Sequence, residues 1–127
     1  MEAVYLDTHV VVWLFAGEVE KLSSRVVEII EDRELLISPM VSLELRFLYE
    51  IGRLRYDRKE VLSSLERTVD LRVDDISFAV LTEESAAQDW TRDPFDRMIV
   101  AHAKCSDNAT LLSRDGKILE HYDRAVW

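Results

Sequence analysis

Short apolar segments alternate with helical segments along the whole chain, and this alternation is the strongest constraint on its fold. Apolar runs of strand length occur at residues 3–6, 35–38, 109–113 and 124–127, with a further short one within 70–75. Helical periodicity or capping residues predict helices over residues 9–16, 21–34, 39–51, 58–69, 77–90 and 116–122, and a further helix from residue 94 onward. Strands that alternate with helices are typical of a parallel sheet covered on both faces. The sequence therefore predicts an α/β fold, a three-layer α/β/α sandwich around a mainly parallel sheet.

Length and composition limit what this fold can contain. The 127 residues, of which 48% are hydrophobic, suffice for one domain with a real core, so we expect residues 1–127 to form a single domain. The longest apolar run covers residues 10–16, which is too short to span a membrane. Acidic residues near the start do not fit a secretory signal, so we expect a cytoplasmic protein without a membrane partner. The single cysteine, Cys105, excludes an internal disulfide and is expected to be buried.

The charge balance argues against a simple nucleic-acid-binding module. The chain has 25 acidic and 16 basic residues, and its formal net charge of −9 repels nucleic acid at long range. This argument does not exclude an enzyme in which bound metal ions neutralise some of the carboxylates.

Two aspartates follow predicted strands directly. Asp7 comes after residues 3–6, and Asp115 comes shortly after residues 109–113. In open parallel sheets the ligand site lies beyond the carboxyl ends of the strands, so both side chains are expected at the same edge. Each has a structural alternative, because Asp7 is a good helix cap and the pair Asp115-Gly116 is typical of a turn.

Two further acids fall on helix faces that are otherwise apolar. On a helical wheel of residues 39–51, Glu44 lies near the middle of an arc formed by Met40, Val41, Leu45, Phe47, Leu48 and Ile51. Asp96 lies within the apolar arc of the helix that begins at Pro94. Its structural alternative is a role at the third helical position, where a carboxylate meets the helix dipole and the unpaired N–H groups. A buried carboxylate must be paired, protonated or bound to a metal. Asp93 is interpreted first as the cap of this helix, from which it could also reach the site.

A cluster of Asp7, Glu44, Asp96 and Asp115 would repel itself without cations. Hard oxygen ligands favour Mg²⁺ or Mn²⁺, and acidic sites with such ions are well suited to phosphodiester hydrolysis. The chain contains no Walker-type loop, no dinucleotide fingerprint and no serine or cysteine nucleophile with a plausible histidine partner.

Four segments resemble the successive motifs of PIN-domain ribonucleases, in particular the VapC-like toxins of toxin–antitoxin pairs. These segments are YLDTHVVVWLF, ISPMVSLELRFLYEIGRL, RDPFDRMIVAHA and TLLSRDGKIL. The resemblance implies a parallel-sheet sandwich whose four-acid Mg²⁺ or Mn²⁺ site cleaves RNA with metal-activated water. It also implies a homodimer and inhibition by a cognate antitoxin that occupies the active-site groove.

By motif, the four acids of such a site correspond to Asp7, Glu44, Asp96 and Asp115 in this chain. Thr8, Ser113 and Arg114 match positions that often support the metal or the phosphate in similar proteins. His102 stands where many similar sequences have glutamine; we expect it to be a core histidine that leaves the metal site unchanged.

Contact with RNA requires basic surface to offset the negative charge. The segment RLRYDRK supplies Arg53, Arg55, Arg58 and Lys59 and is the candidate for RNA contact. An ordinary solvated loop is the alternative.

Two other functional classes remain: a PIN-fold interaction module without catalysis, and a receiver-type phospho-acceptor domain, which would require paired acids after the first strand.

Overall fold

A single five-stranded parallel sheet organises the chain. The structure is a computed structural model that describes residues 2–127. Its strands are β1 (Ala3–Leu6), β2 (Glu34–Ile37), β3 (Arg72–Val73), β4 (Thr110–Leu112) and β5 (Ala125–Val126). They lie in the order β3-β2-β1-β4-β5, and every neighbouring pair is parallel. The predicted α/β class and parallel sheet are confirmed.

The strand order separates this fold from the receiver-type alternative. Receiver domains have the order 2-1-3-4-5, in which the first strand lies one position from the edge. Here β1 is the central strand and pairs with both β2 and β4. The chain therefore does not have the receiver fold.

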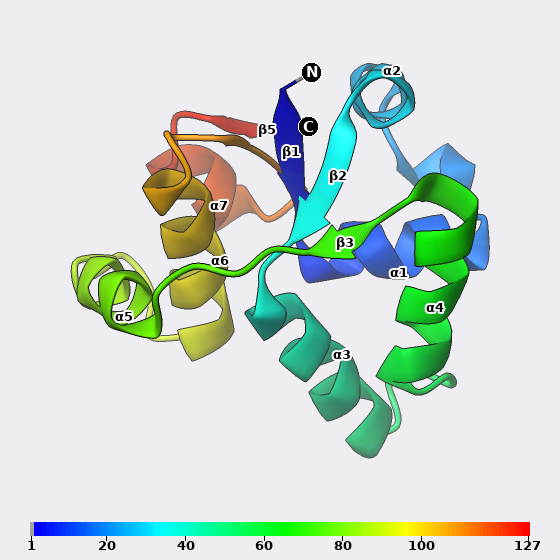
Figure 1. Cartoon of the computed structure of the whole chain (residues 1–127), viewed down its shortest axis with the longest axis horizontal. Coiled ribbons are helices and arrows are strands. Elements are labelled where there is room, and N and C mark those ends of the chain that lie inside the picture. Colours follow the sequence, from blue (N-terminus) through cyan, green and yellow to red (C-terminus); the bar gives the residue numbers. More distant parts are fainter. Residues whose placement is uncertain (1) are drawn as a thin grey trace.

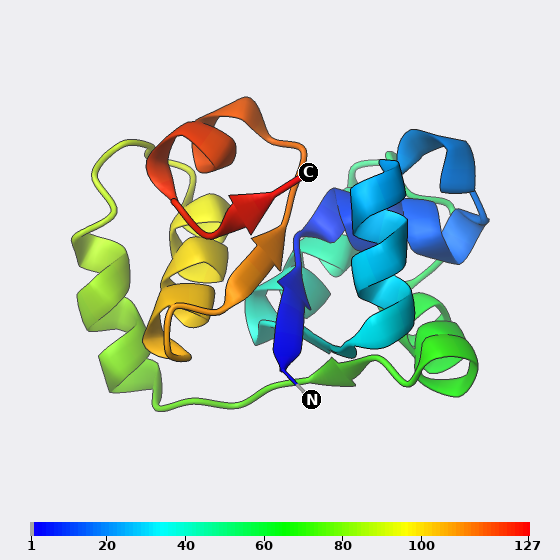
Figure 2. The same ribbon diagram turned by 90° about the horizontal axis from the view of Figure 1, so that it is seen from above.

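Helices cover both faces of the sheet. On one side lie α1 (Thr8–Ala16), α2 (Ser24–Asp32) and α4 (Arg58–Val69), and on the other lie α5 (Phe78–Ala86), α6 (Pro94–Cys105) and α7 (Gly116–His121) (Figure 1, Figure 2). Helix α3 (Pro39–Glu50) lies beyond the ends of β1 and β2 and packs against α1, α4 and α6 (Figure 1). It closes the carboxyl edge of the sheet, where the sequence predicts a site.

Polar residues cap several of the helices, and three of these caps follow a strand. Asp7, Ser38, Asp93 and Asp115 cap α1, α3, α6 and α7 by accepting backbone hydrogen bonds. Pro39 and Pro94 occupy the first positions of α3 and α6, where a missing N–H costs nothing. The same side chains that begin these helices are thereby placed at the carboxyl edge of the sheet.

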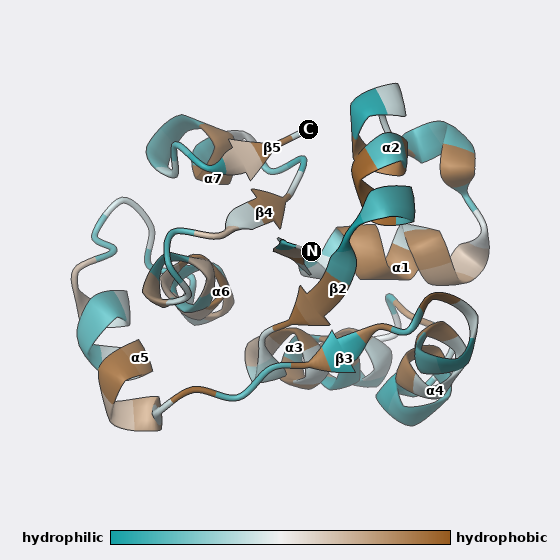
Figure 3. Cartoon of the chain, turned by 45° about the horizontal axis from the view of Figure 1, so that its top comes forward, coloured by the Kyte–Doolittle hydropathy of each residue, from teal (hydrophilic) through white to brown (hydrophobic). Residues whose placement is uncertain are grey.

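The core lies between the sheet and its two helical layers. Helix α1 and the ends of β2 and β4 are hydrophobic, whereas β3 and much of the outer surfaces of α2 and α4 are hydrophilic (Figure 3). Val4 and Leu6 of β1, Val10 and Val11 of α1, and Leu111 of β4 are completely buried. This packing holds the end of β1 rigidly against the start of α1. Within residues 2–127, no helix has the length and hydrophobicity needed to cross a membrane.

Some local predictions are wrong. A 3-10 helix, η1 (Val19–Lys21), follows α1 and is too short to give a periodic pattern. Helix α5 ends at Ala86 rather than near residue 90, where the N–H groups of Ala87 and Gln88 bond to carbonyls three residues back and the α-helical pattern stops. Cys105 is half-buried at the end of α6, not buried in the core.

The predicted apolar arc of α3 is buried only in part. Val41 and Leu45 are completely buried, but Phe47 and Ile51 are exposed. One reason is that Phe47 packs against the ring of Phe95, with the ring centroids 5.7 Å apart, at the surface rather than in the core. Glu44 is consequently half-buried on the side of α3 that faces the end of β1.

Candidate active site

A pocket of about 510 Å³ opens at the carboxyl edge of the sheet, where α1, α3, α6 and α7 begin or pass. All four predicted metal-binding acids line it, and so does Asp93. The lining residues are Asp7, Thr8, His9, Val12, Trp13, Glu44, Leu48, Arg53, Leu54, Asp93, Asp96 and Asp115. The pocket thus collects carboxylates from segments that lie far apart in the sequence.

Asp7 is the most deeply buried of these acids, with 3% of its surface exposed. Its Oδ1 atom accepts a hydrogen bond of 2.8 Å from the backbone N–H of Thr8, and its Oδ2 atom accepts one of 2.7 Å from the hydroxyl of Ser113. Burial raises the pKa of Asp7 above its ordinary value, and these hydrogen bonds oppose the increase. The side chain is therefore held in one orientation by β4 and by its own helix.

Glu44 reaches the pocket from α3. Its Oε1 atom accepts a hydrogen bond of 2.5 Å from the hydroxyl of Thr8. Burial raises the pKa of Glu44, the bond from Thr8 lowers it, and repulsion from Asp7 and Asp93 raises it further. The contact with Thr8 links the helix that carries Glu44 to the turn that carries Asp7.

Asp93 and Asp96 have different roles in the structure although they are three residues apart. Oδ1 of Asp93 caps α6 by accepting from the N–H groups of Phe95 at 2.9 Å and of Asp96 at 3.3 Å. The carboxylate of Asp96 accepts no hydrogen bond from any of residues 2–127. It does not cap the helix, so the structure favours the interpretation of Asp96 as a pocket residue.

The surroundings of Asp96 disfavour a negative charge. Burial raises its pKa to about 7, with repulsion from Asp93 as the next cause and smaller contributions from Asp7, Asp115 and Glu44. A carboxyl group that is half protonated near neutral pH and has no hydrogen-bond donor is a candidate ligand for a cation.

Asp115 is oriented by two sets of bonds. Its Oδ1 atom caps α7 by accepting from the N–H groups of Lys117 and Ile118, at 2.9 and 3.1 Å. Its own N–H donates to Ser113 Oγ at 3.0 Å. The completely buried hydroxyl of Ser113 therefore joins Asp115 to Asp7.

His9 and Trp13 also line the pocket, although neither was among the predicted site residues. His9 Nε2 accepts a hydrogen bond of 3.0 Å from the backbone N–H of Arg114, and its Nδ1 lies 3.5 Å from Asp7 Oδ2. The imidazole packs against the ring of Trp13 with the ring centroids 5.0 Å apart. No sequence pattern indicated this role, because the partner of His9 is a backbone group on another strand–helix connection.

The predicted RNA-contact residues differ in their position relative to the pocket. Arg53 lines the pocket, and Arg55 lies just outside it. Arg58 turns toward α3, where its guanidinium lies 3.3 Å from Ser42 Oγ, and Lys59 is exposed on α4. The guanidinium of Arg114 lies over the ring of Trp127, 5.9 Å from its centroid. Among these cations, Arg53 is the one that borders the acids.

His102 lies away from the pocket. It is completely buried in α6, and its Nε2 atom is 3.0 Å from Asp74 Oδ2, which also accepts from the hydroxyl of Tyr5. This agrees with the prediction of a core histidine. His102 contacts none of the four candidate acids, and its nearest polar partner follows β3.

The carboxylates suit a divalent cation in chemistry, since all donors are hard oxygen atoms that repel one another. Within residues 2–127, however, no three His, Cys, Asp or Glu side chains converge closely enough to hold a metal ion in their present positions. Asp7 and Asp115 are fixed by hydrogen bonds, whereas Asp96 has none. Binding of an ion would therefore require a rearrangement of the less constrained acids.

Several solved structures contain chains with the same fold. A chain in the crystal structure of VapBC2 from Rickettsia felis, bound to a promoter DNA fragment, is 17% identical with a TM-score of 0.68; the match covers 98% of this chain and 96% of that one. A chain of VapBC-1 from nontypeable Haemophilus influenzae is 18% identical with a TM-score of 0.65, and the match covers 98% of this chain and 96% of that one. A chain of DNA-bound VapBC from Salmonella typhimurium is 20% identical with a TM-score of 0.63, and the match covers 99% of this chain and 98% of that one. At these identities the likeness establishes the fold.

Comparison at the level of sequence gives the family. No curated protein matches the chain significantly. The model of the PIN domain family matches residues 4–125, which include the four motifs and nearly every element of the structure. The chain belongs to the PIN domain family.

Proposed function

We propose that this protein is a metal-dependent endoribonuclease that hydrolyses RNA phosphodiester bonds, and that it is the toxin of a toxin–antitoxin pair. The observation that carries the proposal is the single pocket lined by Asp7, Glu44, Asp96 and Asp115, in which the pKa of Asp96 is raised to about 7. Family membership and the likeness to chains of VapBC complexes support it.

The four acids would hold Mg²⁺ or Mn²⁺, which supplies the activation of water and the neutralisation of phosphate charge that this hydrolysis needs. Ser113 fixes the orientation of Asp7 and of the Asp115 backbone, and Thr8 fixes Glu44. Asp96 supplies the least constrained carboxylate. Asp93 keeps the start of α6 in place and raises the pKa of Asp96.

Arg53 is the residue of the pocket with a permanent positive charge, and in the proposed enzyme it binds a phosphate of the RNA. The structure offers no serine or cysteine in the pocket that could serve as a nucleophile. Hydrolysis by water without a covalent intermediate is therefore the mechanism that fits this set of lining residues.

Two protein partners complete the proposal: a cognate antitoxin and a second copy of the chain. Phe78 and Val80 on α5 expose 71% and 53% of their surfaces, and Leu43 and Phe47 on α3 are also exposed. Large exposed apolar side chains of this kind favour a protein interface.

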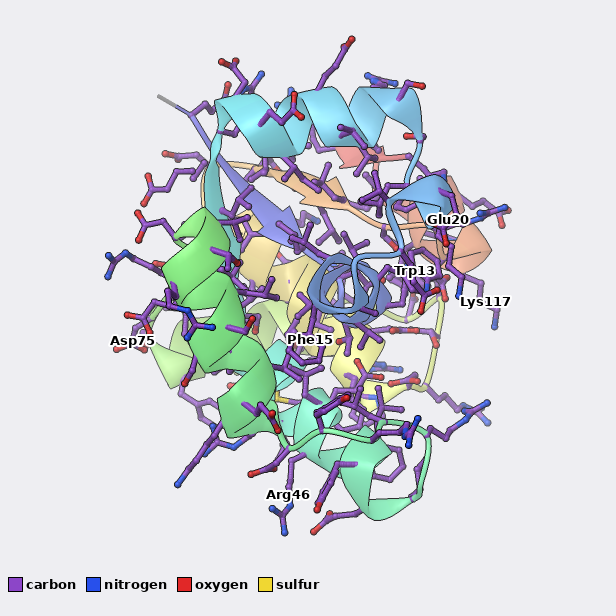
Figure 4. All side chains as sticks on the ribbon, turned by 90° about the vertical axis from the view of Figure 1, so that its right-hand side faces the viewer. Trp13, Phe15, Glu20, Arg46, Asp75 and Lys117 are labelled. Carbon is purple, nitrogen blue, oxygen red and sulfur yellow. The ribbon has the colours of Figure 1, made fainter. Side chains whose placement is uncertain are left out.

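The test is cleavage of a panel of labelled single-stranded RNAs with Mg²⁺, with Mn²⁺ and with EDTA, for the wild-type protein, Asp96→Asn and the control Asp75→Asn. Asp75 is exposed and lies far from Trp13 and the pocket (Figure 4). We expect metal-dependent cleavage that Asp96→Asn abolishes and Asp75→Asn leaves unchanged. Cleavage that persists in EDTA or in Asp96→Asn would contradict the proposal.

Failure to cut any RNA, by a folded protein that binds no metal, would favour the alternative of a PIN-fold interaction module. Binding of Mn²⁺ is measured separately by calorimetry. A protein without a metal site would show no Mn²⁺ binding, whereas a nuclease tested on an unsuitable RNA would bind Mn²⁺ without cutting.

A further inference from the structure

A second, smaller pocket adjoins the acidic one. It has a volume of about 200 Å³ and is lined by Val12, Phe15, Ala16, Glu18, Arg53, Leu54, Arg55 and Tyr56. Val12, Arg53 and Leu54 line both pockets, so the two lie side by side along α1. Whatever chain occupies the acidic pocket would continue into this one.

The connection between α3 and α4 builds the outer wall of the second pocket. Gly52 has φ of +79°, a conformation that favours glycine, and it turns the chain back after α3. Arg53 N–H then donates to Leu48 O at 2.9 Å, and the side chain of Leu54 is buried in the core. With Leu54 anchored, the flanking residues Arg53 and Arg55 are exposed.

These two arginines are available for an anionic ligand. Within residues 2–127, no carboxylate lies within ion-pair distance of Arg53 or Arg55, whereas Arg46 binds both Glu50 and Asp57. The one acid of the second pocket, Glu18, forms an ion pair with Lys21. In a chain of net charge −9, two exposed arginines without carboxylate partners beside the acidic pocket form a local site of opposite charge.

Aromatic rings form the floor and side of the pocket. Phe15 is partly buried on α1 and leaves this helix on a different side from Trp13 (Figure 4). The ring of Tyr56 packs against Phe15 with the ring centroids 5.2 Å apart and the planes at 69°, and 45% of Tyr56 is exposed. Exposed aromatic rings next to unpaired arginines are the usual components of sites that stack a nucleobase and bind its phosphate.

We propose that this second pocket is a nucleotide subsite for the single-stranded RNA substrate. Tyr56, supported by Phe15, stacks on the base of a nucleotide next to the scissile bond, while Arg53 and Arg55 bind the phosphates between that nucleotide and the acidic pocket. The subsite deepens the proposed nuclease function and rests on it. Stacking tolerates every base, so the subsite strengthens binding without selecting a sequence.

The test measures RNA binding without cleavage, and can therefore succeed or fail independently of catalysis. Fluorescence anisotropy at low ionic strength, in EDTA, compares a short labelled single-stranded RNA with a strand of the same length that lacks all bases. The proteins are wild type, Tyr56→Ala, Tyr56→Phe and Arg55→Gln. Two controls match them: Tyr49→Ala, whose ring is 41% exposed on α3, and Arg25→Gln on α2, which is exposed.

We expect Tyr56→Ala to weaken binding of the base-bearing RNA about five-fold or more and to leave binding of the base-free strand unchanged. Tyr56→Phe keeps the ring and should bind like the wild type. Arg55→Gln should weaken binding of both strands and reduce the dependence of log affinity on log salt by about one charge. Tyr49→Ala and Arg25→Gln should change neither affinity.

Several results would overturn the subsite. One is an equal effect of Tyr56→Ala on both strands, and another is an effect no larger than that of Tyr49→Ala. Absence of measurable RNA binding by the wild-type protein also counts against it. Unchanged RNA binding in both Tyr56→Ala and Arg55→Gln would make a protein segment the better occupant of the pocket. Thermal unfolding of each variant verifies that the fold is retained.

Discussion

The hydroxyl of Thr8 donates a 2.5 Å hydrogen bond to Oε1 of Glu44 and thereby couples the first turn of α1 to the middle of α3. Thr8 is 3% exposed, so this bond forms in a protected environment. Its neighbour Asp7 is held by Ser113 in the same way. Two hydroxyl groups therefore orient two of the four proposed metal ligands.

Replacement of Thr8 by Val should weaken metal binding. The hydroxyl stabilises the charged form of Glu44, so its loss raises the pKa of Glu44 further and leaves the side chain without its orienting bond. Loss of such supporting partners typically costs about 10–100-fold in metal affinity. Calorimetric titration with Mn²⁺ measures the effect, with Thr68→Val as control because Thr68 bonds only to Ser64 O on exposed α4. Equal affinities for Thr8→Val and wild type would show that the bond has no part in metal binding.

Asp96 should make the metal-free protein less stable as the pH rises. Its pKa is raised from 3.8 to about 7 in the folded state. The stabilisation is complete below pH 4 and is lost as the pH rises through about 7, because the unfolded chain releases this proton more readily. Asp96→Asn carries no charge and should not lose this stability as the pH rises. At pH 8 in EDTA its free energy of unfolding should therefore exceed that of the wild type by on the order of 1–2 kcal/mol, after allowance for solvent screening.

Urea unfolding at pH 5 and pH 8 measures this difference. Saturating Mn²⁺ should reverse the order of stability at pH 8, because the ion binds the folded wild type more tightly than the variant. A decrease in stability of metal-free Asp96→Asn at pH 8 would instead assign Asp96 a structural role at the helix start.

Asp93 allows its two roles to be separated. Asparagine caps helices as well as aspartate does, so Asp93→Asn should retain the stability of α6 while it removes one charge beside Asp96. The pKa of Asp96 should then fall below about 7, which a carboxyl NMR titration follows directly. Asp93→Ala loses the cap as well and should lower stability by about 1 kcal/mol relative to Asp93→Asn. An unchanged pKa of Asp96 in Asp93→Asn would exclude the electrostatic role.

Loss of the Ser113 hydroxyl should affect both stability and metal binding. Ser113→Ala leaves the N–H of Asp115 and one oxygen of Asp7 without a partner, at a cost of about 1–3 kcal/mol. The buried Ser85, whose hydroxyl donates to Leu81 O and to Met98 Sδ and bonds none of the pocket acids, provides the control. Ser85→Ala should retain Mn²⁺ affinity, whereas Ser113→Ala should lose it. Retention of affinity in Ser113→Ala would mean that Asp7 needs no fixed orientation.

Local sequence signals predicted the elements that position the site. The caps at Asp7, Ser38 and Asp93 mark the starts of α1, α3 and α6 because each depends on the few residues that follow it. The strand ends placed Asp7 and Asp115 at one edge for the same reason. Helical periodicity also identified Glu44 and Asp96 as unusual positions for charge, although it counted the exposed Phe47 as core.

Features that depend on distant contacts were not predictable in this way. His9 meets a backbone N–H at Arg114, and no local pattern signals such a partner. The basic segment beginning at Arg53 looked like one patch, but the turn at Gly52 and the anchor at Leu54 send Arg58 toward α3. How four acids share one pocket is a property of the packed layers, which sequence periodicity does not describe.

The bond between Asp7 and Ser113 joins residues 106 positions apart in the chain. On a ribosome, residues near Asp7 emerge long before β4 is synthesised, and without β4 neither Ser113 nor Asp115 is present to complete the pocket. Contacts between such distant residues form late, since they require closure of a long loop. In the proposed nuclease the active site is therefore not assembled during most of translation, and the messenger RNA that encodes the protein is not exposed to a complete site until synthesis has passed this strand.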